Sequence, residues 1–284
     1  MVLKLPLLYI APLVCHTREL SSVINKLSAQ VKLLRILFNS LILIASSAAL
    51  AEHPLVSDDT GVLDPGGWEL TVGLSGESRP VTDSVELPGV EVSYGFYENM
   101  QLMGFVARQV IEDSGESSKS GWGEGGIGYK WRFYHKNGNA LAFAPEYAFP
   151  LTSSSRIRGL VEDVRVLSLP LIGSIERGDW EFTVQASFDL TSASVNGLGY
   201  GVWAGYSITE SLQLLAEIYG EELSGGVTEA GEDGGVTNWR LGLSWDFAEG
   251  FSLLAAYGGD IRSDLPSEEK LDYDYFLGVR WETE

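Results

Sequence analysis

The chain carries one short motif with the spacing of a cofactor site. Residues 123–128 read Gly-Glu-Gly-Gly-Ile-Gly, the G-x-G-x-x-G pattern with which a loop cradles the pyrophosphate of a dinucleotide. Such a site needs a strand before the glycines and a helix after them. Residues 129–133 instead alternate between apolar and polar, which predicts a strand. We therefore expect these glycines to relieve crowding within a sheet, and we expect no cofactor.

Side chains suited to acid–base, nucleophilic or metal chemistry are scarce. His53 and His135 fall in an N-terminal segment and in a short turn, and neither is placed beside a serine on a strand as a hydrolase requires. The single cysteine, Cys15, cannot complete a disulfide or a metal cluster within one chain. The acidic run 229–233 lacks the ligand spacing of a calcium loop. These features predict a protein that is not an enzyme and holds no metal.

Ionisable side chains recur instead at alternate positions, which share one face of a strand. The predicted inward set contains both acids and bases: Glu69, Glu91, Lys130, Arg132, Glu146, Glu181, Glu217, Arg240, Asp246, Asp274 and Arg280. Because an unpaired charge is costly to bury, the face that they share must be either wet or fully paired. Counting outward from a turn at Asn137 pairs Arg132 with Ala142 and puts Lys130 diagonal to Glu146, which predicts a cross-strand ion pair.

The elements that carry these side chains are predicted to be strands. The stretch Trp180–Leu190, WEFTVQASFDL, alternates between apolar and polar residues throughout, as a strand with one apolar and one polar face does. The same alternation predicts twelve strands, at 67–77, 88–97, 100–111, 125–134, 140–149, 164–175, 180–190, 197–207, 212–221, 237–247, 251–259 and 271–281. Most have about the 9–11 residues that a tilted strand needs to cross a bilayer.

The connections between these strands alternate in length. Short turns, such as 97–99 and 135–139, alternate with longer polar loops at 78–87, 112–121, 150–163, 191–196, 222–236 and 260–270. Aromatic residues gather near strand ends, as in the two girdles of a membrane barrel. A soluble sandwich has no reason to sort its loops in this way. We therefore predict an all-β fold, a transmembrane antiparallel up-and-down β-barrel at 67–284 with both termini in the periplasm.

Residues 31–51 have the pattern of an export signal. Lys32 and Arg35 precede an apolar run, and Ala49-Leu50-Ala51 supplies the small residues that a signal peptidase reads. We predict a signal peptide at 31–51, a mature start at Glu52 and a periplasmic N-terminal segment at 52–66. Residues 1–30 are interpreted as a gene-start artefact or leader, since Val31 can be encoded by an alternative start codon.

Two patches of the chain resemble an outer-membrane family. Residues 53–61, HPLVSDDTG, contain Pro54, Leu55, Asp58 and Asp59, and residues 125–132 read GGIGYKWR. These patches resemble proteins described as phenol-degradation meta-pathway outer-membrane proteins, which open on a Pro-Leu-x-Thr-Asp-Asp-like motif. The resemblance implies an outer-membrane barrel through which small, often aromatic, compounds pass.

Three classes of function stay open on the sequence. The first is a passive channel for small solutes, the second a structural or adhesive barrel whose inward charges pair off, and the third an outer-membrane enzyme. The formal net charge of −20 makes nucleic acid an unsuitable partner. The expected partners are outer-membrane lipid and lipopolysaccharide of a Gram-negative cell, the barrel-assembly machinery and a small-molecule solute.

Overall fold

The computed structural model describes residues 54–283 except 116, 194, 226, 228–230 and 232. The predicted signal peptide, the leader before it, His53 and part of the acidic run 229–233 lie outside the described residues. Within the described part, no helix has the length and the apolar character needed to cross a membrane. The elements are β1 (Trp68–Ser78), β2 (Thr82–Tyr97), β3 (Met100–Asp113), β4 (Lys119–Lys136), β5 (Asn139–Phe143), β6 (Glu146–Pro150), α2 (Ser153–Ile157), β7 (Val166–Ser168), β8 (Leu171–Arg177), β9 (Trp180–Thr191), β10 (Asn196–Thr209), β11 (Leu212–Ser224), β12 (Gly234–Ala248), β13 (Phe251–Ser263) and β14 (Tyr273–Glu282).

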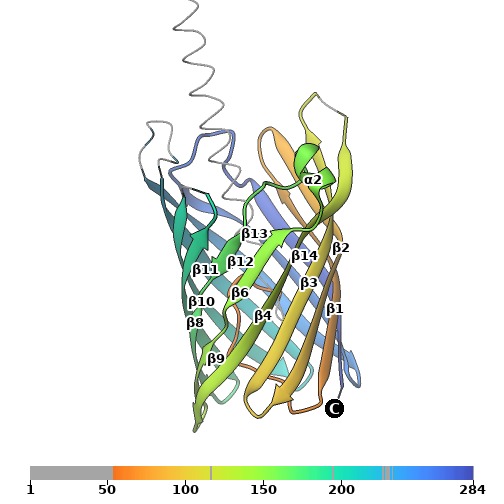
Figure 1. Cartoon of the computed structure of the whole chain (residues 1–284). Coiled ribbons are helices and arrows are strands. Elements are labelled where there is room, and N and C mark those ends of the chain that lie inside the picture. The colour runs from red at the N-terminus through yellow and green to blue at the C-terminus, as the bar shows by residue number, and fades with distance from the viewer. Residues whose placement is uncertain are drawn as a thin grey trace, which may run out of the picture. The chain divides into compact units, whose positions relative to one another are not determined.

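These strands close on themselves as an antiparallel barrel (Figure 1). Each strand pairs with its neighbours in sequence, and β14 returns to pair with β1 from Ser78↔Tyr273 to Glu69↔Glu282. The pairs β5 with β6 and β7 with β8 are each one interrupted strand, so that the described residues form a barrel of twelve strands. The predicted fold class is confirmed. Closure leaves no unpaired sheet edge, which a bilayer would not tolerate.

Both interruptions occur at prolines, which have no N–H to donate to a ladder. Pro145 separates β5 from β6, and Pro170 separates β7 from β8. The two breaks are neighbours, because Ala144 N donates to Pro170 O at 3.1 Å. Tyr129 N on β4 donates to Pro145 O at 3.1 Å, so hydrogen bonding continues across the break. The wall therefore stays closed where the strand is interrupted.

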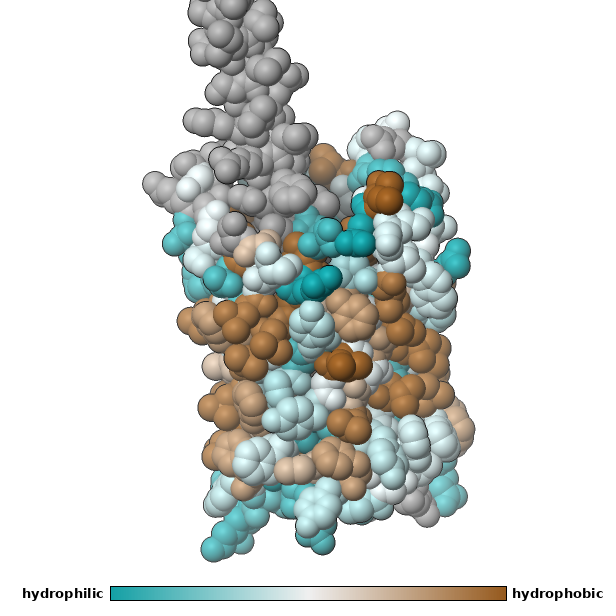
Figure 2. Space-filling model, in the orientation of Figure 1, coloured by the Kyte–Doolittle hydropathy of each residue, from teal (hydrophilic) through white to brown (hydrophobic). Residues whose placement is uncertain are grey.

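The alternation along β9 separates a lipid-facing side from an inward side. Phe182 and Val184 are 47% and 55% exposed, whereas Thr183 between them is fully buried. On the face shown in Figure 2, apolar side chains gather over the middle of the strands and hydrophilic ones gather at the two ends. Such a belt is what the hydrocarbon core of a bilayer covers. The apolar face of Trp180–Leu190 thus points outward rather than into a protein core.

The turns and loops are sorted by length as predicted. Five turns have two residues each in the described part, at 98–99, 137–138, 178–179, 210–211 and 249–250. The C-terminus lies at the same end of the barrel as these turns (Figure 1). At the turn after β4, Asn137 and Gly138 have φ of 54° and 66°, the left-handed pair that a tight hairpin requires.

Most of the loops predicted to be long are shorter than expected, and the first two are shortened to five residues or fewer. The connection predicted at 78–87 is reduced to 79–81, and the one predicted at 112–121 is reduced to 114–118. The reason is that β2 and β4 begin at Thr82 and Lys119 and continue as hairpins beyond the apolar belt, where both faces are polar and alternation loses its contrast. The Gly-rich run 123–128 lies within β4 with no helix after it, which confirms its interpretation as part of a sheet.

Candidate functional site in the barrel lumen

The first described residues lie inside the barrel. We call Pro54–Leu63 the strap. Pro54, Leu55 and Ser57 are buried, and the strap ends beside the two-residue turns, where Gly66 N donates to Gly95 O at 2.7 Å. This placement differs from the periplasmic segment predicted for 52–66. The sequence pattern carries no signal for it, because the strap has neither strand nor helix periodicity and its partners are more than a hundred residues away in several cases.

Backbone N–H groups of the strap donate to side chains of the barrel wall. Val56 N and Ser57 N donate to the two carboxylate oxygens of Glu217 on β11 at 2.9 and 2.7 Å. Asp58 N donates to Gln185 Oε1 on β9 at 2.9 Å. Toward the turn end, Leu63 N donates to Gln101 Oε1 on β3 at 2.8 Å. These bonds satisfy backbone groups that would otherwise be buried without partners.

Lys130 on β4 is the cation that holds the strap. Its side chain is fully buried, and Nζ lies 2.8 Å from Asp58 Oδ1 and 3.4 Å from Asp59 Oδ1. The predicted register, in which Arg132 pairs with Ala142, is confirmed. Lys130 reaches the strap, whose two adjacent carboxylates provide an acidic partner within the lumen.

Apolar packing anchors the other face of the strap. Leu55 forms a buried cluster with Trp203 on β10 and Leu215 on β11, and Trp203 Nε1 donates to Asp58 O at 3.4 Å. This contact explains why a bulky ring occupies an inward position of β10. A Cβ atom on Gly201 would lie 1.6 Å from Ser57 Oγ, so the strap approaches closely because this residue is a glycine.

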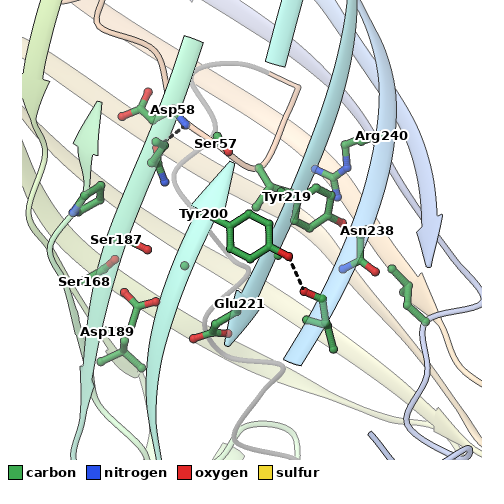
Figure 3. A pocket seen from close by; sticks show the side chains of 18 of the residues that line it. Ser57, Asp58, Ser168, Ser187, Asp189, Tyr200, Tyr219, Glu221, Asn238 and Arg240 are labelled. Atoms are coloured by element: carbon green, nitrogen blue, oxygen red, sulfur yellow. Dashed lines mark hydrogen bonds between the residues drawn. The ribbon is translucent and has the colours of Figure 1, made fainter. Parts of the chain in front are cut away.

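A chamber of about 160 Å³ lies between the strap and the long loops. The strap contributes Val56, Ser57 and Asp58 to its wall. Figure 3 shows Ser57 and Asp58 with side chains of β9–β12 around the chamber. Seven acidic residues line the chamber, against two arginines: Asp58, Glu77, Glu146, Asp189, Glu221, Asp260 and Glu269, with Arg79 and Arg240. An excess of carboxylates in a confined space favours cations over anions.

Both arginines of the chamber are bonded to acids. Arg79 Nη2 lies 2.7 Å from Glu77 Oε2. Arg240 Nη2 lies 2.8 Å from Asp274 Oδ2, which also accepts a hydrogen bond from Tyr219 Oη at 2.7 Å. The guanidinium of Arg240 is 5.6 Å from the centre of the Tyr219 ring. The charges of both arginines are therefore balanced locally by acids.

The long-loop end of the lumen carries an apolar cluster. Its buried members come from β6, β7, β11 and four of the long connections: Ala148, Val164, Val166, Val195, Leu223, Val227 and Leu265. Phe105 from β3, across β4 from Ala148, packs against this cluster. A Cβ atom on Gly126 would lie 2.3 Å from the Phe105 ring, so that glycine in β4 makes room for it. The cluster narrows the lumen beyond the chamber.

One acid in the long loop after α2 is held in an apolar setting. Burial, reinforced by the nearby charge of Glu124, raises the pKa of Glu162 to about 8. Its Oε2 atom has no hydrogen-bond partner among the described residues. The loop around it is packed inward, because Leu160 is buried and Arg158 Nη1 donates to Ser120 O at 2.9 Å.

The predicted inward residues fall into two groups. Glu69, Glu91, Lys130, Glu217 and Asp274 are buried, Arg240 and Glu181 are partly buried, and Glu146 lines the chamber. The others lie toward the two-residue turns. Arg132 Nε donates to Asn99 Oδ1 at 3.1 Å, and Asp246 accepts a hydrogen bond from Ser252, which in turn accepts one from Arg280. The motif residues Pro54, Leu55, Asp58 and Asp59 all belong to the strap.

Sequence reasoning missed the chamber acids Asp189 and Glu221. The alternation of β9 already put Asp189 on the polar face with Glu181, and Glu221 is in phase with Glu217 on β11. Their positions in the alternation of each strand were thus sufficient to identify both as inward residues. Their proximity was not visible, because it depends on the register of β10 between them.

Comparisons with known proteins support the fold alone. No family model and no curated protein match this chain. Among solved structures, the COG4313 outer membrane channel from Pseudomonas putida F1 is similar with a TM-score of 0.62 at 14% identity, over 80% of this chain and 99% of that one. The NanC porin matches with a TM-score of 0.52 at 10% identity, over 75% and 98%. The KdgM porin in complex with disordered oligogalacturonate matches with a TM-score of 0.50 at 10% identity, over 75% and 99%.

Proposed function

We propose that this chain is an outer-membrane channel through which small polar solutes cross passively, and that the strap closes the lumen between passages. The observation that carries the proposal is the polar chamber enclosed inside a lipid-facing barrel. Its volume of about 160 Å³ matches the roughly 150 Å³ of a cavity that takes up one benzene-sized molecule. A barrel that served only as a scaffold has no use for such a space.

The way in which the strap is held supports a gate rather than a permanent plug. The strap belongs to no strand of the barrel, and side chains from β3, β4, β9 and β11 hold it through hydrogen bonds and the ion pairs of Lys130. Removing such an element leaves every strand ladder intact. Its displacement therefore opens the lumen without unfolding the barrel.

We further propose the cellular setting. The segment 31–51 acts as a cleaved export signal, the two-residue turns face the periplasm, and the barrel-assembly machinery inserts the chain among lipid and lipopolysaccharide. Protease treatment of intact cells should then cut within 151–165 or 225–233, at the long-loop end. Cuts confined to the turns at 137–138 and 178–179 would show that the barrel has the opposite orientation in the membrane.

A structural barrel is the second candidate, because one observation favours it. The strap and the apolar cluster narrow the lumen on both sides of the chamber, and its best-defined charges are paired, as in Lys130 with Asp58. A permanently plugged barrel would look the same in a single state. The polar lining also supports polar solutes more than the aromatic compounds that the family resemblance implies.

A reversible crosslink separates these candidates. Thr60 Oγ1 on the strap lies 2.5 Å from Ser174 Oγ on β8, so the double variant Thr60→Cys, Ser174→Cys brings two thiols within reach of a disulfide. Cys15, the single cysteine of the chain, precedes the predicted cleavage site. We expect stepwise conductance in planar bilayers with the reduced protein and its loss on oxidation.

Each outcome has a separate meaning. The Thr60→Cys single variant should conduct equally under both redox conditions. If oxidation forms the disulfide in the double variant but does not change its conductance, the protein is a channel and the strap is not its gate. No conductance from folded barrels in either state favours the structural barrel.

A further inference from the structure

Two carboxyl groups of the chamber face each other across a strip of wall that has no side chains. Asp189 on β9 and Glu221 on β11 flank β10, whose inward positions between them are Gly197 and Gly199. Gly197 pairs with Asp189, and Gly199 pairs with Glu221. A Cβ atom on Gly197 would lie 1.6 Å from Glu221 Oε1, so the Glu221 side chain lies across this glycine. The two glycines thus form a groove in which the acids meet.

One acid of the pair has hydrogen-bonding capacity that the described residues leave unused. Asp189 pairs with Ser168 between β9 and β7, and Figure 3 shows Asp189, Ser168 and Glu221 close together with Ser187. Asp189 is only 6% exposed, yet its Oδ1 atom has no hydrogen-bond partner in the described part of the chain. Two carboxylates held close together repel each other when both are ionised. A cationic donor between them relieves that repulsion and leaves both groups ionised.

The donors and acceptors here suit an ammonium group. A primary ammonium has three N–H donors and no acceptor, and two carboxylates with neighbouring hydroxyls supply acceptors for all three. Ser187 contributes to this groove, since a Cβ atom on Gly199 would lie 2.2 Å from its hydroxyl. Among the described residues, no group of three or more acidic, histidine or cysteine side chains is placed to hold a metal ion. An organic cation therefore fits better than a divalent metal.

We propose that Asp189 and Glu221, with the hydroxyls of Ser168 and Ser187, form a recognition site for the primary ammonium group of a small organic cation. The site deepens the proposed function, on which it rests, by naming the class of solute that the chamber selects. Arg79 and Arg240 do not cancel the field, because Glu77 and Asp274 already neutralise them. Small amines are then retained in the chamber in preference to alcohols and carboxylates of the same size.

Calorimetric titration of the folded full-length mature barrel in detergent tests this site. The probes are n-butylammonium, n-butanol and butyrate, which share one carbon chain. We expect saturable binding of the amine alone, and at least a tenfold weaker affinity in Asp189→Asn. Gly197→Ala keeps every charge but displaces Glu221, and it should weaken binding as well. Asp246→Asn removes an exposed acid at the turn end and should change nothing.

The results separate this proposal from the channel itself. Equal binding of amine and alcohol, or an amine affinity that Asp246→Asn lowers as much as Asp189→Asn does, overturns the ammonium site. Conductance in planar bilayers is measured on the same preparations. A barrel that conducts but shows no preference for the amine supports the proposed channel and contradicts the ammonium site. A barrel that binds the amine but does not conduct supports the ammonium site and contradicts the channel.

Discussion

Replacing Lys130 by methionine should free the strap while leaving the barrel folded. Methionine keeps most of the length and apolar volume of the lysine side chain, so the main change is the lost ammonium group. That group is fully buried and lies within 3.4 Å of carboxylates on both Asp58 and Asp59. Its removal leaves two acids of the strap close together in the lumen without this cation, which favours states in which they reach water.

The magnitude follows from the burial of the pair. Removing one partner of a buried ion pair costs about 3–5 kcal/mol. The side chains of Asp58 and Asp59 are 11% and 22% exposed. Because the pair is not fully buried, we take the lower end of this energy range, about 3 kcal/mol. At about 1.4 kcal/mol for each factor of ten, the population with a displaced strap rises roughly a hundredfold.

The assay is the single-channel open probability in planar bilayers. We expect a large rise for Lys130→Met, whereas Lys136→Met, an exposed lysine at the turn end of the same strand, should behave as the wild type. Adding Asp58→Asn to Lys130→Met should restore part of the closed population, because one of the two uncompensated charges is gone. Gel mobility before and after heating shows whether each barrel is folded. An open probability that stays equal in folded Lys130→Met and Lys136→Met refutes the reasoning.

Three further predictions concern other parts of the barrel. Gly201→Val should also raise the open probability, because the valine side chain would occupy the space of Ser57. The control Val202→Ala, on the lipid side, should leave the open probability unchanged. An unchanged open probability in Gly201→Val would contradict the packing of the strap. Val184→Arg should lower the free energy of folding into lipid by about 2–4 kcal/mol if that position lies at mid-membrane, measured by urea titration in vesicles; a neutral effect would place it elsewhere. Because the pKa of Glu162 is raised to about 8, the packed loop binds more protons than the open loop and loses stability as pH rises from about 4.5 to about 8. Tryptic cleavage of that loop relative to Glu162→Gln should therefore increase over this range, and a constant ratio would argue against the shift.

Several features of the barrel could be read from local pattern. The alternation of β9 determined which of its residues meet lipid, and the Asn137-Gly138 pair determined a tight hairpin and hence that Arg132 pairs with Ala142. The strand predicted after the Gly-rich run also indicated correctly that the run belongs to a sheet. These features depend on residues within one strand or one hairpin, where side-chain direction repeats every second residue.

The strap and the acid pair were decided by tertiary structure. Val56 and Ser57 meet Glu217 at a separation of about 160 residues, and nothing within HPLVSDDTG indicates that the segment turns into the lumen. Asp189 and Glu221 meet because the registers on both sides of β10 place them opposite Gly197 and Gly199, and the Glu221 side chain lies across Gly197. Sequence determines the face on which a side chain lies, whereas the partner that it meets across the lumen depends on how strands distant in sequence are aligned around the closed barrel.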